Sequence, residues 1–323
     1  MADATQGGTD IQYLGLLAPA LIALIAGLVI HSFIIGVNVT DWLKGRTVTS
    51  FDHVVISLGI SRMCAQSTNT LHYFMAKLSP IKLDLNVTLA IIKSFYYFFM
   101  CANIWLTSLF SIIFCLKISN FHSRLFLYLK RMIVQRTVYC IAVSVLLSAL
   151  SYAISLSMFW PELTRGQTHN MTMVTKFIDC GKITFLYNYI TGYLFPLLLY
   201  YISSVLLFTS LYHHTTKMKM SSNSSINLET YYSVMTCVSF TFTFNTICFI
   251  VALVCAFYYY VYCVNLYWLY IILDFLPVLH SSYLIYKTDK LRSQMSKVLQ
   301  NVMDFLFQRK NTETRESIEV VTI

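Results

Sequence analysis

An uncharged stretch from Phe95 to Leu116 constrains the fold of this chain most strongly. Its 22 residues contain no Asp, Glu, Lys or Arg. Because an α-helix rises about 1.5 Å per residue, ~20 residues cross a hydrocarbon layer of ~30 Å. Four basic residues and no acidic ones follow between Lys117 and Arg131. This pattern is typical of a membrane helix whose C-terminal end faces the cytoplasm, whereas a helix in a soluble core rarely lacks charges over such a length.

The composition extends this prediction to most of the chain. Of the 323 residues, 57% are hydrophobic and only 11% are charged, against about 25% charged residues in globular proteins. A soluble chain of this composition could not cover its own surface, so the membrane is the expected solvent. The net charge of +9 comes from short basic clusters between apolar runs, which argues for orientation in a bilayer and against nucleic acid binding.

Seven apolar segments are long enough to cross a membrane. The predicted fold class is therefore an all-α membrane protein, a seven-transmembrane-helix bundle followed by a short amphipathic helix. The spans are expected near 14–37, 51–74, 89–116, 134–158, 183–211, 231–258 and 264–286. Together they form a receptor domain, 14–288, after an extracellular N-terminus, 1–13.

The C-terminal region has a different pattern. Within 289–307, apolar residues recur at helical spacing, which predicts an amphipathic helix on the membrane surface. The residues expected on its apolar face are Leu291, Met295, Val298, Val302 and Phe305. The polar segment 308–323 is predicted to be a disordered cytoplasmic tail.

The basic residues also predict the orientation. With the N-terminus outside, 16 of the 23 Lys and Arg residues lie in inner segments and five lie in outer ones. This excess predicts a multi-pass plasma-membrane protein with an extracellular N-terminus and a cytoplasmic C-terminus. Asn170, in the sequence Asn-Met-Thr, then lies outside and is expected to carry a glycan. Residues 1–13 lack a basic region, so the first helix rather than a cleaved signal peptide should direct insertion.

Two ionisable residues lie deep within predicted spans. Arg62 in the second span and Asp274 in the seventh are each about 17 Å from the cytoplasmic side, estimated from helix rise. A lone charge at this depth costs at least ~2.5 kcal/mol. We therefore hypothesise that Arg62 and Asp274 pair, with His31 at a similar depth. A switch between inactive and active states, a static polar clamp and no contact at all remain open alternatives.

The outer halves of several spans are rich in aromatic residues. Part of this enrichment is expected from the interfacial belt of Tyr and Trp. The remaining residues could line an outward-facing cavity for small amphipathic ligands, which such mostly apolar walls suit. The candidate ligand-binding residues are Tyr96, Met100, Asn103, Asn188, Tyr193, Phe244, Asn245, Tyr267 and Tyr270. No catalytic motif and no metal-ligand spacing is present, so we expect no enzyme activity, no metal and no cofactor.

Short motifs spread over almost the whole chain resemble those of the type 2 (bitter) taste receptors. The first inner boundary reads FIIGVNVTDWLKGR from Phe33 to Arg46, and the second span contains Ile60-Ser61-Arg62-Met63. The third span ends in LKISNF at 116–121, followed by FLYLKR at 126–131, and the seventh contains His280-Ser281. The chain departs from the family pattern at His31, where Asn is usual, and at Tyr96 and Met100, where many members have Trp and Asn.

The resemblance implies a chemosensory G-protein-coupled receptor for bitter compounds, with a gustducin-like heterotrimeric G protein as its partner. The implied G-protein contacts are Lys117, His122, Lys130, Arg131, His214, Lys217 and Lys290. The same basic loops also suit contact with anionic membrane lipids. The alternatives are a vomeronasal type 1 pheromone receptor and, from a different class, a small transporter or channel. The sequence leaves homo- or hetero-oligomers open.

Overall fold

Helices account for all regular structure in the described residues. The computed structural model describes residues 3–47, 49–78, 83–119, 124–166, 189–220, 225–262 and 266–321. Seven long helices correspond to the predicted spans: α1 (Asp3–Leu43), α2 (Ser50–Leu78), α3 (Leu83–Ile118), α5 (Thr137–Gly166), α8 (Phe195–Met220), α9 (Ser225–Tyr262) and α10 (Tyr267–Lys287). The other elements are α4 (Arg124–Gln135), the π-helical segment η1 (Tyr189–Leu194) and α11 (Asp289–Val321).

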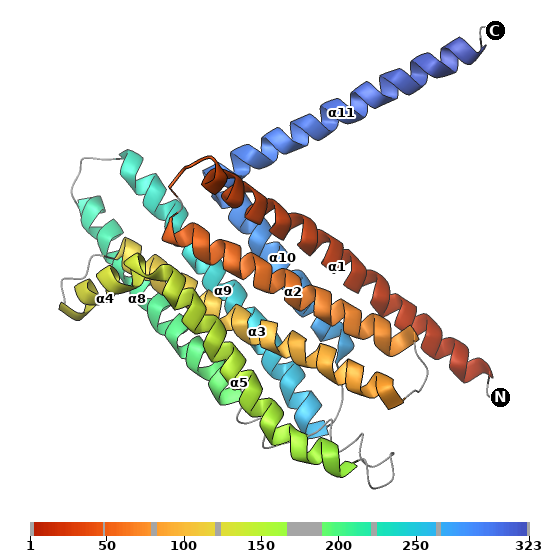
Figure 1. Ribbon diagram of the computed structural model, residues 1–323. Coiled ribbons are helices and arrows are strands. Elements are labelled where there is room, and N and C mark those ends of the chain that lie inside the picture. The colour runs from red at the N-terminus through yellow and green to blue at the C-terminus, as the bar shows by residue number, and fades with distance from the viewer. Residues whose placement is uncertain are drawn as a thin grey trace. The chain divides into compact units, whose positions relative to one another are not determined.

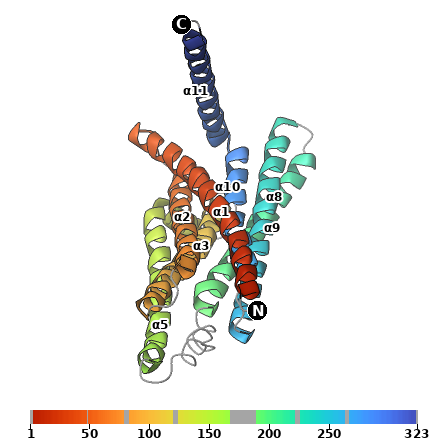
Figure 2. The ribbon, with the colours of Figure 1, turned by 90° about the vertical axis from the view of Figure 1, so that its right-hand side faces the viewer.

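The chain divides into two units, residues 1–280 and 281–323, and each is described by itself. In the first unit, α2 packs against both α1 and α3, and α3 also packs against α5 and α8. These helices run side by side in both views (Figures 1 and 2). The most apolar part of the α3 span is 56% buried, the largest share among the candidate spans. The uncharged stretch from Phe95 to Leu116 therefore lies in α3, the central helix of this unit.

Small apolar clusters join α3 to its neighbours. At one end of the unit, Val54 of α2 packs with Leu109 and Ile113 of α3, and Ile133 of α4 packs against this cluster. A second cluster joins α3 to α8 and α9 through Cys115, Leu207, Leu211 and Val238. These contacts come from five elements, so they fix the bundle rather than any single helix.

The outer surfaces of the helices are apolar. Val29 of α1, Leu146 of α5 and Ile202 of α8 are 62%, 66% and 58% exposed, respectively. Large apolar side chains in such numbers do not suit contact with water but suit contact with lipid chains. Six described helices are long and apolar enough to cross a membrane. The prediction of an all-α membrane bundle is thus confirmed.

The second predicted span differs from the other six. Helix α2 has 29 residues, which at 1.5 Å per residue is about 43 Å and sufficient to cross a bilayer. It does not reach the apolarity of the other candidate spans, because it carries Asp52, Arg62 and several amide and hydroxyl side chains. Since α2 lies between α1 and α3, its polar groups can be shielded from lipid by protein.

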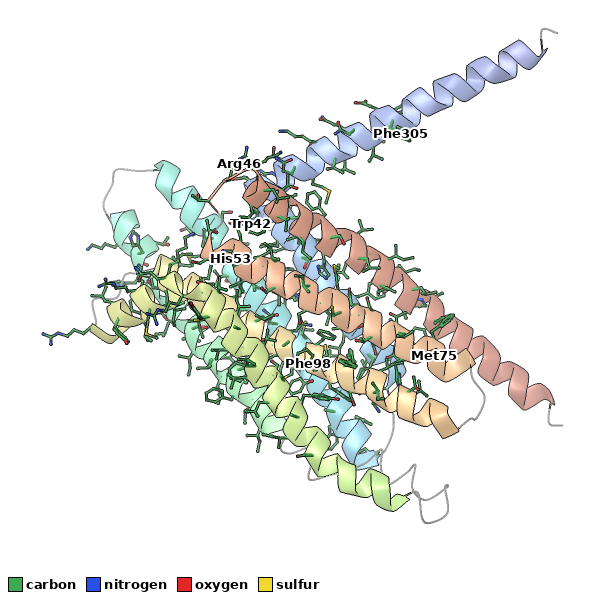
Figure 3. All side chains as sticks on the ribbon, in the orientation of Figure 1. Trp42, Arg46, His53, Met75, Phe98 and Phe305 are labelled. Atoms are coloured by element: carbon green, nitrogen blue, oxygen red, sulfur yellow. The ribbon has the colours of Figure 1, made fainter. Side chains whose placement is uncertain are left out.

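Helix α1 ends in a defined turn within the Asp-Trp-Leu-Lys-Gly-Arg motif. Gly45 has a positive φ of 72°, a conformation that glycine adopts without steric cost at helix ends. The Arg46 backbone N–H donates to the Asp41 carbonyl at 3.1 Å, and the Arg46 Nη1 pairs with the Asp41 carboxylate at 2.8 Å. Figure 3 shows Arg46 and His53 at one end of the first unit and Met75 at the other end.

Some boundaries differ from the sequence-based expectation. Helix α1 begins at Asp3 rather than near 14. Helix α4 covers residues 124–133, which were expected in an inner loop, and the first two residues of the predicted fourth span, because Ile133 on its apolar side packs into the core. The segment predicted to be disordered continues α11 as far as Val321. The C-terminal helix is therefore longer than predicted, and acid and base four residues apart along it favour helix formation.

Candidate functional site

Polar side chains of α2 and α10 meet in the interior of the first unit. The Arg62 Nη1 lies 3.2 Å from the His280 Nδ1, and the Asn69 Nδ2 donates to the Asp274 Oδ2 at 2.6 Å. Residue numbers rise along α2 as they fall along α10, so the two helices run in opposite directions. Asp274 consequently lies level with Asn69, two helical turns beyond Arg62.

The structure does not bring Arg62 and Asp274 into the ion pair that we hypothesised. Among the described residues, the carboxylate of Asp274 forms its hydrogen bond with Asn69, and no ion pair includes it. The equal depths came from counting residues from each predicted helix end, and errors in those ends add. The antiparallel register instead matches Arg62 to His280. His31, in contrast, is close enough to Arg62 for the two to interact electrostatically.

Gln66 joins three helices at the same level. Its Nε2 donates to the backbone carbonyl of Asp274 at 2.6 Å, and its side chain is buried. On the other side it lies against Gly27 of α1, where an added Cβ would overlap the Gln66 amide. Glycine at position 27 thus leaves room for the Gln66 side chain, which contacts α1 and bonds to α10.

His31 is the most enclosed of these polar residues. Its side chain is fully buried, and neither ring nitrogen has a hydrogen-bond partner in the part of the chain that the structure describes. The charge of Arg62 acts on both His31 and His280. Arg62 and two imidazoles therefore form a basic polar cluster within the apolar bundle, contributed by α1, α2 and α10.

The wide π-helical turn before α8 has a physical cause in Pro196. Proline has no backbone N–H, so it cannot donate to the carbonyl of Gly192 four residues earlier. The Gly192 carbonyl instead lies 3.5 Å from the Cys101 Sγ of α3. The Pro196 carbonyl accepts a hydrogen bond from the Ser108 hydroxyl, also on α3. The irregular start of this span is therefore held by α3.

Three buried serines continue the contact between α3 and α8. The Ser203 hydroxyl donates to the Ser111 Oγ at 2.7 Å, and the Ser111 and Ser204 hydroxyls lie 3.0 Å apart. Ser203→Ala should lower the free energy of unfolding by about 0.6–2 kcal/mol, as for other hydrogen bonds between membrane helices. Thermal unfolding of detergent-purified protein measures this change.

Ser144→Ala is the matched control for Ser203→Ala. Ser144 and Ser203 are both 6% exposed, but the Ser144 hydroxyl bonds only the Cys140 carbonyl of its own helix among the described residues. Its removal should therefore change stability less than removal of Ser203. Equal destabilisation by the two substitutions would contradict a specific contact between α3 and α8.

Several predicted ligand-binding residues gather in one region. Tyr96, Met100 and Asn103 share a face of α3, since they are spaced by four and three residues. Tyr193 of η1 and Tyr270 of α10 lie close enough to the buried Tyr96 to act electrostatically on its hydroxyl, as does Tyr73 of α2. The Asn103 Oδ1 is buried and has no hydrogen-bond partner among the described residues.

The other predicted ligand-binding residues have different surroundings. Phe244 packs in an apolar cluster with α10, and its ring centroid is 5.6 Å from that of His280. The Asn245 Nδ2 donates to the Tyr200 hydroxyl at 3.1 Å and so joins α9 to α8. Asn188 and the predicted glycosylation site Asn170 lie outside the described residues, as does the side chain of Tyr267.

The predicted G-protein contacts lie on separate elements. In the first unit, Lys117, Arg131, His214 and Lys217 are exposed on α3, α4 and α8. Lys130 is half-buried, and its Nζ lies 3.5 Å from the Ser119 carbonyl at the end of α3. Lys290 is exposed on α11 in the second unit, and His122 lies outside the described residues.

The fold and the buried polar contacts define the class of protein. The chain is a multi-pass helical-bundle membrane protein, with polar residues of several helices joined in its interior. The family model for taste receptor proteins (TAS2R) matches residues 10–303. The chain therefore belongs to the taste receptor family, as the sequence motifs predicted.

Individual members of this family are moderately similar to the chain. A protein of Papio hamadryas named Taste receptor type 2 member 9 is 31% identical over 194 residues, which cover 59% of this chain and 61% of the relative. The Homo sapiens protein of the same name is 31% identical over 193 residues, with the same coverage. Mus musculus Taste receptor type 2 member 16 is 25% identical over 210 residues, covering 64% and 69%. The chain thus matches about three fifths of the length of the member 9 relatives.

Proposed function

We propose that this chain is a chemosensory G-protein-coupled receptor that responds to small bitter compounds. The observation that carries the proposal is the family match over residues 10–303. Similar proteins in three mammals are named as taste receptors of type 2. The interior of the bundle supports the same function, because polar groups held between helices are typical of sites where a membrane protein binds or responds.

The proposed ligand site lies around Tyr96 on the face of α3 that also carries Met100 and Asn103. It combines aromatic rings with few polar groups, as small-molecule sites commonly do. A ligand would activate the receptor by binding the active arrangement of the helices more tightly than the resting one. Such a ligand would rearrange two sets of helix contacts: those of α2 with α10 and those of α3 with α8.

The proposed coupling surface is the opposite, basic end of the bundle. Lys117, Arg131 and Lys217 are exposed there, and Arg46 marks the same end of the first unit. A gustducin-like G protein is the proposed partner. Exposed basic residues on α3, α4 and α8 would provide electrostatic complementarity to an acidic protein surface.

The function can be tested by calcium imaging of cells that express this chain together with a promiscuous G-protein α subunit. We expect responses to one or more members of a bitter-compound panel, and none in cells that lack the receptor. Responses to small pheromones alone would favour a vomeronasal type 1 receptor instead. Ion flux without any ligand would indicate a channel. Either result would overturn the proposal.

The proposed orientation places Asn170 outside the cell. We expect a glycosidase that removes N-linked glycans to increase the gel mobility of the receptor, and Asn170→Gln to abolish that shift. Asn223→Gln is the matched control, because its sequon lies in a predicted inner segment and should not be modified. If the mobility shift persists in Asn170→Gln and disappears in Asn223→Gln, the orientation is the opposite of the one proposed.

A further inference from the structure

We propose that Asp274 is the counter-ion for a cationic amine group of the ligand, held among Tyr73, Tyr96, Tyr193 and Tyr270. This inference rests on the proposed function and names the chemical class of the ligand. Asp274 is 5% exposed, and in the described part of the chain its carboxylate has one neutral partner, Asn69. A carboxylate offers about four lone-pair positions, so most of its accepting capacity remains for a ligand.

The tyrosines supply the second part of the site. They come from four elements, α2, α3, η1 and α10. Tyr73, Tyr193 and Tyr270 each lie within electrostatic range of the Tyr96 hydroxyl. Asp274 lies within the same range. Tyr96 is buried, whereas the other three are half-buried. Aromatic faces attract organic cations, so a carboxylate in the neighbourhood of aromatic rings favours an ammonium group with apolar substituents.

The position of Asp274 suits entry from the predicted outer side. Asp274 is seven residues after Tyr267, the first residue of α10, which corresponds to about 10 Å along the helix. Arg62 lies two turns deeper on α2, and its positive charge opposes deeper movement of a cation. The ammonium group would therefore stop at the level of Asn69 and Asp274.

Asn103 offers a second acceptor on the same side of α3 as Tyr96. The two residues are seven apart and share a helical face, and the buried Oδ1 of Asn103 has no partner among the described residues. A buried acceptor without a donor is costly, and a donor group of the ligand would satisfy it. The proposed ligand is thus an aromatic or aliphatic amine that carries a further hydrogen-bond donor.

The competing explanation is that Asp274 has only a structural role as a partner of Asn69. Asp274→Asn separates the two explanations, because asparagine keeps the size and hydrogen bonding of the side chain but removes its charge. Lidocaine and denatonium serve as cationic probes, and salicin and coumarin serve as neutral ones. Calcium responses are measured at matched surface expression, and ligand-induced shifts in the thermal unfolding of purified receptor report binding without signalling.

We expect the wild-type receptor to respond to a cationic probe, and Asp274→Asn to weaken that response at least 30-fold while sparing any response to a neutral probe. Responses of the wild-type receptor to neutral probes alone, or an unchanged cation response in Asp274→Asn, would overturn this inference and leave the proposed function intact. Absence of every response and of every thermal shift would instead overturn the proposed function.

A second variant keeps the test decisive if Asp274→Asn does not fold. Tyr270→Leu removes a half-buried ring while preserving an apolar side chain, and Tyr270→Phe retains the ring. We expect Tyr270→Leu to weaken responses to the cationic probes by about tenfold, with Tyr270→Phe close to wild type, because the face of the aromatic ring attracts the cation. If Tyr270→Leu and Tyr270→Phe weaken the responses equally, or if they weaken responses to cationic and neutral probes equally, the tyrosine rings do not select the cation.

Discussion

The Gly27→Ala receptor is expected to reach the cell surface at a small fraction of the wild-type level. The added Cβ would overlap the Gln66 amide, with the Gln66 Nε2 at 2.9 Å. Gln66 would then have to leave the Asp274 carbonyl, to which it donates at 2.6 Å. Overpacking and a lost buried hydrogen bond each cost about 1–3 kcal/mol. The gain in helix propensity from alanine, about 1 kcal/mol, does not offset this cost. Surface labelling of an N-terminal epitope, which the proposed orientation places outside the cell, measures the outcome.

Gly36→Ala is the control on the same helix, because an added Cβ there has no neighbour within 4 Å. It should leave surface expression unchanged or raise it slightly. Combining Gly27→Ala with Gln66→Ala makes room for the new methyl group, so the double variant should lose less than the sum of the two single variants. Equal surface levels of Gly27→Ala and Gly36→Ala would show that α1 and α2 do not approach each other as described.

His280→Leu is expected to have the second large effect. The leucine side chain fills a similar volume but removes the nitrogen that lies 3.2 Å from the Arg62 Nη1. Hydrogen bonds to charged groups contribute about 1.5–3 kcal/mol, and a buried charge that loses a partner is costly. We therefore expect the thermal unfolding midpoint of the purified receptor to fall clearly below that of the wild type.

His280→Asn tests whether the acceptor or the ring causes this effect. Asparagine retains an acceptor for the Arg62 guanidinium but loses the aromatic contact with Phe244, whose ring centroid is 5.6 Å from that of His280. We expect His280→Asn to be more stable than His280→Leu. A greater stability of His280→Leu would mean that packing, rather than the hydrogen bond with Arg62, is the main role of His280.

The sequence was sufficient to predict the long helices because length and apolarity determine them directly. The partners of Arg62 and Asp274 could not be derived in the same way, since they depend on the relative register of two helices distant in sequence. One signal was available in α2 itself. Arg62, Gln66 and Asn69 are spaced by four and three residues, so they form one polar stripe. This stripe indicates a polar partner helix, although it does not identify α10.

The π-helical segment shows a similar limit. Pro196 predicts an interruption of regular hydrogen bonding, but it does not predict the contacts of this segment with Cys101 and Ser108, which α3 contributes. Phe244 illustrates the opposite case. Its type and its place in an aromatic-rich span predict a ligand contact, which stays a prediction, whereas its packing with Leu273 and Leu276 is seen only in the structure. Aromatic composition alone does not distinguish a ligand contact from a helix–helix contact.

The most direct test of the receptor function is nucleotide exchange on a purified heterotrimeric G protein by the purified chain in lipid nanodiscs. An agonist identified by calcium imaging should accelerate uptake of a non-hydrolysable GTP analogue several-fold over the rate without agonist. Boiled receptor and empty nanodiscs provide the baseline. An uptake rate that is the same with and without agonist, at a receptor concentration where agonist binding is demonstrated, would contradict the assignment of this chain as a G-protein-coupled receptor.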